Sequence, residues 1–201
     1  TLEQLKNGEL KGTVRLNLSE NLSQFPAEIF DLADSLEILD LSNNQLSELP
    51  QDLNRLKKLR ILFCSNNEFT CLPPMLSLCQ NLEMIGFKSN KITQVPASSL
   101  PLQTRLLILT DNRIKELPET LGQLENLEKL MLAGNQLTKL PQSIHLCHKL
   151  GLIRLSANQL NEFPDLVLDL PKLAWLAFSG NPFCLADSSE SQIPTMPLDS
   201  F

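Results

Sequence analysis

Residues 127–141 read Leu127-Glu-Lys-Leu-Met-Leu-Ala-Gly-Asn-Gln-Leu-Thr-Lys-Leu-Pro141. Leu130 and Leu132 alternate with other residues, Asn135 follows, and a Leu-Pro step closes the stretch. Apolar residues at every second position predict a short strand with one buried face. Proline suits a return segment that does not donate to a strand ladder. The stretch therefore predicts a strand, a sharp turn and a return segment.

The same pattern recurs along the chain and is anchored on an asparagine. The asparagines are Asn21, Asn44, Asn67, Asn90, Asn112, Asn135, Asn158 and Asn181, spaced 23 residues apart except for one interval of 22. The pattern L-x-x-L-x-L-x-x-N-x-L-x-x-L-P is that of leucine-rich repeats. We predict an α/β repeat fold, a right-handed leucine-rich-repeat solenoid of about eight 22–23-residue repeats. Its concave face is a parallel sheet, and its convex face carries short helical or 3₁₀ segments.

The recurring asparagine has a structural role at the turn after each strand. Its side chain both donates and accepts hydrogen bonds, so a column of asparagines can satisfy buried backbone groups. We predict that all eight form this column, Asn21 included. Leu22 follows Asn21 directly, so the first repeat is one residue short there. The fourth repeat loses a residue around positions 97–101, outside its strand, where loops tolerate such changes.

Three segments follow from the pattern: an N-terminal cap at residues 1–12, the solenoid at 13–184, and a linker or tail at 185–201. Solenoid ends need capping because their core is otherwise exposed. Leu2 and Leu5 lie among charged residues and predict a short capping helix.

At the other end, Asn181-Pro-Phe-Cys184 is similar to the opening of the cysteine-rich cap of extracellular repeat proteins, but no cysteine follows it. The chain starts at Thr1 rather than Met, and the segment up to Phe201 reads as a linker. We therefore expect a segment of a longer protein.

Composition excludes several classes of function. The net charge of −6 and the pI of about 5.0 argue against a chain devoted to phosphate backbones. No apolar run approaches the roughly 18 residues of a membrane span, and the first residues are not those of a signal peptide. The chain has five cysteines, an odd number, and none of them form clustered pairs in the sequence. This pattern favours a reducing, cytoplasmic location over a disulfide framework.

Strand alternation places the residues six, four and two positions before each asparagine on the concave face. These rows hold an apolar stripe flanked by cations, and protein interfaces favour aromatic, Met and Arg residues. The predicted partner-binding residues are Ile38, Ile61, Phe63, Met84, Lys88, Leu106, Ile108, Lys129, Met131, Arg154 and Trp175. The partner is a protein or peptide of unknown identity. Two alternatives are open: the row at minus six is part of the sheet wall, or these residues pack on a neighbouring domain of the same chain.

Groups that resemble chemical sites have simpler explanations. In His145-Leu-Cys147-His148 the cysteine holds an apolar position of the repeat, and no further ligands accompany the motif, whereas zinc usually needs four. Cys64 and Cys79 also hold core positions and should be inert, whereas Cys71 and Cys184 are expected to be more exposed. No Gly-rich phosphate loop or Ser/His/Asp set stands out. We expect no catalytic residue, no metal and no cofactor, so the chain is not an enzyme by itself.

Several stretches resemble a more specific group. They are Leu62-Phe-Cys-Ser-Asn-Asn67, Ile85-Gly-Phe-Lys-Ser-Asn90, Leu107-Ile-Leu-Thr-Asp-Asn112, Leu130-Met-Leu-Ala-Gly-Asn135 and Leu173-Ala-Trp-Leu-Ala-Phe-Ser-Gly-Asn-Pro-Phe183. They resemble the repeat region of bacterial leucine-rich-repeat protein kinases over about residues 1–185. In that family a Ser/Thr-type kinase domain follows the repeats, so the resemblance implies a recruiting or regulatory module.

The kinase motifs themselves are not in this sequence: it has no G-x-G-x-x-G loop, no H-R-D and no D-F-G. An alternative is the target-recognition domain of a bacterial secreted effector whose catalytic domain is absent here. A third hypothesis, an enzyme in its own right, would need a site that the motifs do not reveal.

Overall fold

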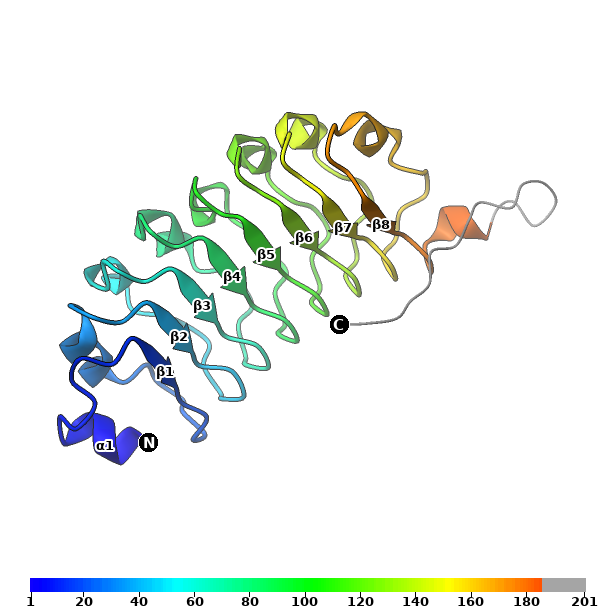
Figure 1. The fold of residues 1–201 in the computed structure, drawn as a ribbon. Coiled ribbons are helices and arrows are strands. Elements are labelled where there is room, and N and C mark those ends of the chain that lie inside the picture. Colours follow the sequence, from blue (N-terminus) through cyan, green and yellow to red (C-terminus); the bar gives the residue numbers. More distant parts are fainter. Residues whose placement is uncertain (186–201) are drawn as a thin grey trace.

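Residues 1–185 are described by the structure, a computed structural model. Eight parallel strands form one sheet in chain order, each paired with the next repeat (Figure 1). The strands are β1 (Arg15–Asn17), β2 (Ile38–Asp40), β3 (Ile61–Phe63), β4 (Met84–Gly86), β5 (Leu106–Ile108), β6 (Lys129–Met131), β7 (Leu152–Arg154) and β8 (Trp175–Ala177). Equivalent repeat positions pair directly, as in Ile38 with Ile61 and Ile61 with Met84. The predicted solenoid is confirmed.

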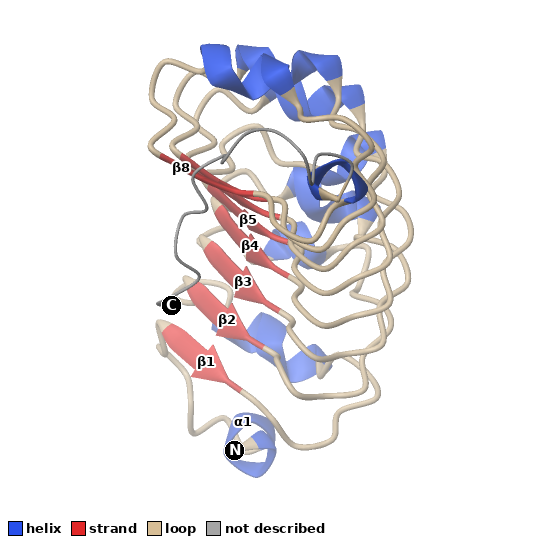
Figure 2. Ribbon diagram, turned by 90° about the vertical axis from the view of Figure 1, so that its right-hand side faces the viewer, coloured by secondary structure: helices blue, strands red, loops and turns tan. Residues whose placement is uncertain are grey.

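A short 3₁₀ turn follows each of the strands β1 to β7 on the opposite, convex side of the arc, and an eighth turn follows β8 apart from that row (Figure 1). The turns are η1 (Ala27–Leu32), η2 (Leu53–Arg55), η3 (Pro74–Leu78), η4 (Ala97–Ser99), η5 (Glu119–Gln123), η6 (Gln142–Leu146), η7 (Asp165–Asp169) and η8 (Pro182–Cys184). Most begin directly after the proline of the Leu-Pro step, whose carbonyl accepts the first hydrogen bond of the turn: Pro26 accepts from the nitrogen of Ile29 (3.1 Å), and Pro118 from that of Leu121 (3.0 Å). Figure 2 shows the strands stacked into one ladder, with the loops of each repeat beside them.

The core is a continuous apolar column between the sheet and the 3₁₀ turns. The middle residue of each strand from β1 to β7 is buried, and the leucines of the return segments meet it from the other side. In the third and fourth repeats Phe69 and Phe87 replace two of these aliphatic residues. Their rings meet edge to face, with centroids 5.0 Å apart.

Seven asparagines form a buried column along the turns, and Asn135 shows the geometry of each. Its Nδ2 donates to the carbonyls of Leu109 (2.9 Å) and Leu132 (3.1 Å), and its Oδ1 accepts from the backbone nitrogen of Ile114 (3.0 Å). Two of these three partners lie in the preceding repeat. The column therefore satisfies turn groups that would otherwise be buried without partners, and it joins each repeat to the one before it.

Asn21 does not belong to this column, so its predicted place there is wrong. Its side chain is exposed and its φ is 55°, the conformation that Asn43, not Asn44, has in the second repeat. The backbone nitrogen of Leu22 donates to Oδ1 of Asn44 at 3.0 Å. In the described chain the first repeat follows α1 rather than another repeat, so a column asparagine at residue 21 would have no carbonyl of a preceding repeat to bind. The missing residue shortens this turn instead.

The N-terminal end of the solenoid is covered by α1 (Leu2–Lys6). Thr1 caps the helix in a capping box with Gln4, and the Leu2 nitrogen donates to Glu20 at 2.9 Å in the first repeat. Leu5 is buried against the first repeat.

At the other end, β8 is only half-buried along its length, because no ninth strand covers it within residues 1–185. Most of the predicted linker, residues 186–201, lies outside the described residues.

Candidate functional site

The concave face contains every predicted partner-binding residue, and the residues differ in exposure. Ile61, Phe63 and Met84 are half-buried, as are the other apolar members of the stripe, because each side chain lies against its neighbours in adjacent strands. Lys88 and Lys129 are exposed. The apolar stripe is therefore part of the sheet wall and also open to solvent.

Phe63 lies on this face in β3, the third of the eight strands, and Gly86 makes room for its ring. The two residues pair in adjacent strands, and a Cβ on Gly86 would lie only 2.5 Å from Cδ1 of Phe63. The ring thus covers the backbone of β4, and Gly86 is buried beneath it. We call the surface formed by Phe63, Ile108 and Met131 the aromatic floor. Ile108 and Met131 hold the paired positions in the next two strands.

A row of alternating charge borders the same face, and the sequence analysis missed it. Glu37, Arg60, Glu83, Arg105 and Glu128 each precede a strand directly. Arg60 bonds Glu37 (2.9 Å) and Glu83 (3.1 Å), and Arg105 bonds Glu128 (3.1 Å). The sequence shows this row at the position seven residues before each asparagine from Asn44 to Asn135, where acidic and basic residues alternate. Exposed pairs of this kind contribute about 0–1 kcal/mol each, so the row fixes register more than stability.

Several exposed large apolar side chains lie elsewhere, on the convex side. They include Leu78, Leu102, Leu146 and Leu168, of which Leu146 is 46% exposed and Leu168 62%. These leucines come from separate turns. They do not form a continuous apolar row, because η5 ends in Gln123 where η6 ends in Leu146. Singly exposed apolar residues are common on soluble proteins, so we assign them no site. They serve as controls for the concave residues.

The metal-like cluster does not converge. Cys147 is fully buried, and its sulfur lies 3.3 Å from the Leu121 carbonyl, whereas His145 and His148 are exposed. His145 instead places Nδ1 2.6 Å from the carbonyl of Gln142 in its own turn. Within residues 1–185 no three His, Cys, Asp or Glu side chains gather as metal ligands would.

Thiol reactivity should divide the cysteines into distinct classes. Burial raises the pKa of Cys79 and of Cys147 to about 11 and raises the pKa of Cys64 further, so all three stay protonated and unreactive in the folded chain at pH 8. Cys184 is exposed, and Cys71 is half-buried with a raised pKa. We expect Ellman's reagent to label Cys184 quickly, Cys71 more slowly, and the other three only after unfolding in denaturant. Rapid labelling of all five in the native chain would contradict the buried positions.

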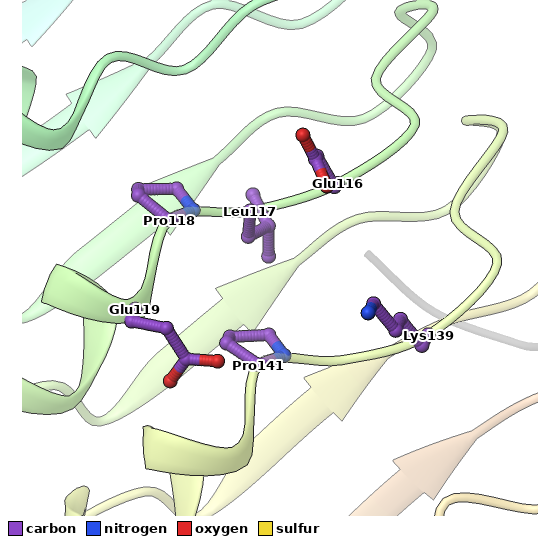
Figure 3. Close-up of a pocket in the computed structure, with 6 residues that line it drawn as sticks. All are labelled: Glu116, Leu117, Pro118, Glu119, Lys139 and Pro141. Atoms are coloured by element: carbon purple, nitrogen blue, oxygen red, sulfur yellow. The ribbon is translucent and has the colours of Figure 1, made fainter.

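A shallow pocket of about 270 Å³ lies between the fifth and sixth repeats, in the return segments (Figure 3). It is lined by Glu116, Leu117, Pro118, Glu119, Lys139 and Pro141. The backbone nitrogen of Ser143 donates to Glu119 at 3.0 Å, and this bond lowers the pKa of the carboxyl group. Glu119 therefore already has backbone partners in η6 and connects two repeats, so the pocket has a structural explanation.

The fold and the repeat geometry define a leucine-rich-repeat domain. Two family models match the chain: "Leucine rich repeat" over residues 103–160, and "Leucine Rich repeats (2 copies)" over residues 34–77. Domains of this class generally bind other proteins and are typically non-catalytic. Within residues 1–185, no helix is both long and apolar enough to cross a membrane.

A solved structure, that of an internalin, has the same fold. An internalin of Listeria monocytogenes is 21% identical, with a TM-score of 0.71 over 87% of this chain and 50% of its own. A leucine-rich-repeat protein of Leptospira interrogans is 24% identical, with a TM-score of 0.44 over 90% of this chain and 63% of its own. The chain thus spans less than two thirds of either protein.

Proposed function

We propose that the chain is a non-catalytic module that binds a protein or peptide on its concave face. The observation that carries the proposal is the open aromatic floor made by Phe63 over Gly86, continued by Ile108 and Met131. Interfaces favour aromatic and methionine side chains of this kind, surrounded by charged groups. The concave sheet also holds these side chains on rigid strands, which lowers the entropy lost on binding.

We further propose that this module recruits a target to, or regulates, a protein kinase. Support comes from the resemblance of stretches such as Leu130-Met-Leu-Ala-Gly-Asn135 to the repeat region of bacterial leucine-rich-repeat kinases. The gene tests this directly. A reading frame that joins residues 1–201 to a domain with a Gly-rich loop, H-R-D and D-F-G supports the kinase, whereas an unrelated catalytic domain supports the effector alternative.

The double variant Phe63→Asp, Met131→Asp tests the binding face. Two carboxylates on the aromatic floor should weaken partner capture by the immobilised chain at least about 30-fold, as expected when central interface residues are lost. Captured proteins are identified by mass spectrometry from the source organism's extract. The control is Leu146→Asp, Leu168→Asp, which places the same charges on more exposed apolar residues of the convex side.

Circular dichroism must show that both double variants are folded, and Met131→Asp alone serves if Phe63→Asp unfolds the chain. If the variant Phe63→Asp, Met131→Asp still captured the partner, or if Leu146→Asp, Leu168→Asp did not, the binding site would not be on the concave sheet.

A further inference from the structure

The concave face differs in charge from the rest of the molecule. The chain as a whole carries −6. In the repeats from β4 to β8, the outward rows instead hold three cations, Lys88, Lys129 and Arg154, and no carboxylate. The outward rows of the earlier repeats carry one charge of each sign, Arg15 and Asp40. A local excess of positive charge favours association with an acidic partner.

These cations have no partners within the described chain. Among residues 1–185, no ion pair involves Lys88, Lys129 or Arg154. Two carboxylates close to these cations in the sequence or in the repeat contact other side chains. Glu128, next to Lys129, bonds Arg105 at 3.1 Å, and Asp111, beside the row of Lys88, accepts from the hydroxyl group of Ser89 at 2.9 Å. Lys88, Lys129 and Arg154 therefore have no ion-pair partner among residues 1–185.

The cations flank the aromatic floor rather than forming a patch of their own. Lys129 and Met131 share β6, and Arg154 pairs with Met131 across β6 and β7. Lys88 follows β4, whose Gly86 lies beneath Phe63. A ligand seated on the floor would therefore have an apolar group over Phe63 and Met131 and could place acidic groups toward the cations on two sides.

We propose that the concave face binds an acidic protein segment, one that presents apolar side chains to the aromatic floor and carboxylates to Lys88, Lys129 and Arg154. The inference rests on the proposed function. Charge complementarity of this kind raises the association rate and selects against basic partners. A nucleic acid fits the surface less well, because three cations are few for a phosphate backbone and the whole chain is acidic.

A random peptide library, displayed on phage and selected on the full chain, tests the chemistry without a known partner. We expect the selected peptides to combine Asp or Glu with Leu, Met or Phe. Synthetic copies should bind the triple variant Lys88→Glu, Lys129→Glu, Arg154→Glu at least about tenfold more weakly than the parent. They should also bind the parent more weakly in 0.5 M salt than in 0.05 M salt. The control Lys57→Glu, Lys115→Glu, Lys172→Glu makes the same change in net charge outside the outward rows and should bind as the parent does.

The outcomes separate this inference from the proposed function. The contrary outcome is a selection of neutral or basic peptides that bind the triple variant Lys88→Glu, Lys129→Glu, Arg154→Glu as they bind the parent, but that do not bind the double variant Phe63→Asp, Met131→Asp. This result would overturn the acidic partner and leave the binding face intact. Peptides indifferent to Phe63→Asp, Met131→Asp overturn the proposed face itself, and so does a selection that enriches nothing. A labelled 20-nucleotide single-stranded DNA that binds the parent and displaces the peptides would replace the acidic segment with a nucleic acid.

Discussion

Replacing Asn135 with alanine should lower the free energy of unfolding by about 3–5 kcal/mol. The side chain makes three hydrogen bonds to backbone groups: the carbonyls of Leu109 and Leu132 and the nitrogen of Ile114. Alanine leaves these groups buried without a partner, and each such group costs about 1–3 kcal/mol. Equilibrium urea denaturation followed by circular dichroism measures the loss.

Asn21 supplies the matched control, since it occupies the same sequence position in the first repeat but is exposed. Asn21→Gly keeps the φ of 55° accessible and should change stability by no more than about 0.5 kcal/mol. Equal losses in the two variants would show that solvent can replace the Asn135 side chain, and that the column is not what holds the turns together.

Phe69→Ala should destabilise the chain by a similar amount, about 3–5 kcal/mol, for a different reason. Phe69 is fully buried, and its ring meets Phe87 edge to face with centroids 5.0 Å apart. Alanine removes that contact and leaves a cavity which the flanking repeats, fixed by their own strands, cannot close. Urea denaturation gives the magnitude.

Phe69→Leu provides the control, because Ile92 and Leu137 hold the equivalent position in other repeats. It should recover most of the stability and cost less than about 1.5 kcal/mol. If Phe69→Leu were as damaging as Phe69→Ala, the aromatic contact with Phe87 rather than the filled volume would be the stabilising feature.

Much of the architecture could be predicted without coordinates, because each repeat contacts only its neighbours and its pattern is local. Alternation at Leu130 and Leu132 specifies a strand, and Pro141 specifies the start of a return segment. Parallel stacking then follows from repetition. The concave residues could be named for the same reason, since alternation dictates which side chains point outward. Their function is an inference beyond that geometry.

Other features depended on contacts between repeats. Whether Arg60 pairs with Glu37, Glu83 or solvent is a matter of how repeats superimpose, and residues 23 positions apart become neighbours only in the stacked solenoid. The exposure of the floor likewise depended on Gly86, whose missing side chain lets the Phe63 ring lie across the sheet. A glycine in the sequence does not say which neighbour will occupy the space above it.

Asn21 and Asn135 separate the two kinds of information most clearly. The sequence by itself determined the repeat, its strands and the asparagine at each turn, because those are properties of a single 23-residue unit. Only the tertiary structure decided which asparagines enter the column. Each column member donates to a carbonyl in the preceding repeat, 26 residues back for Asn135, and Asn21 has no such repeat before it.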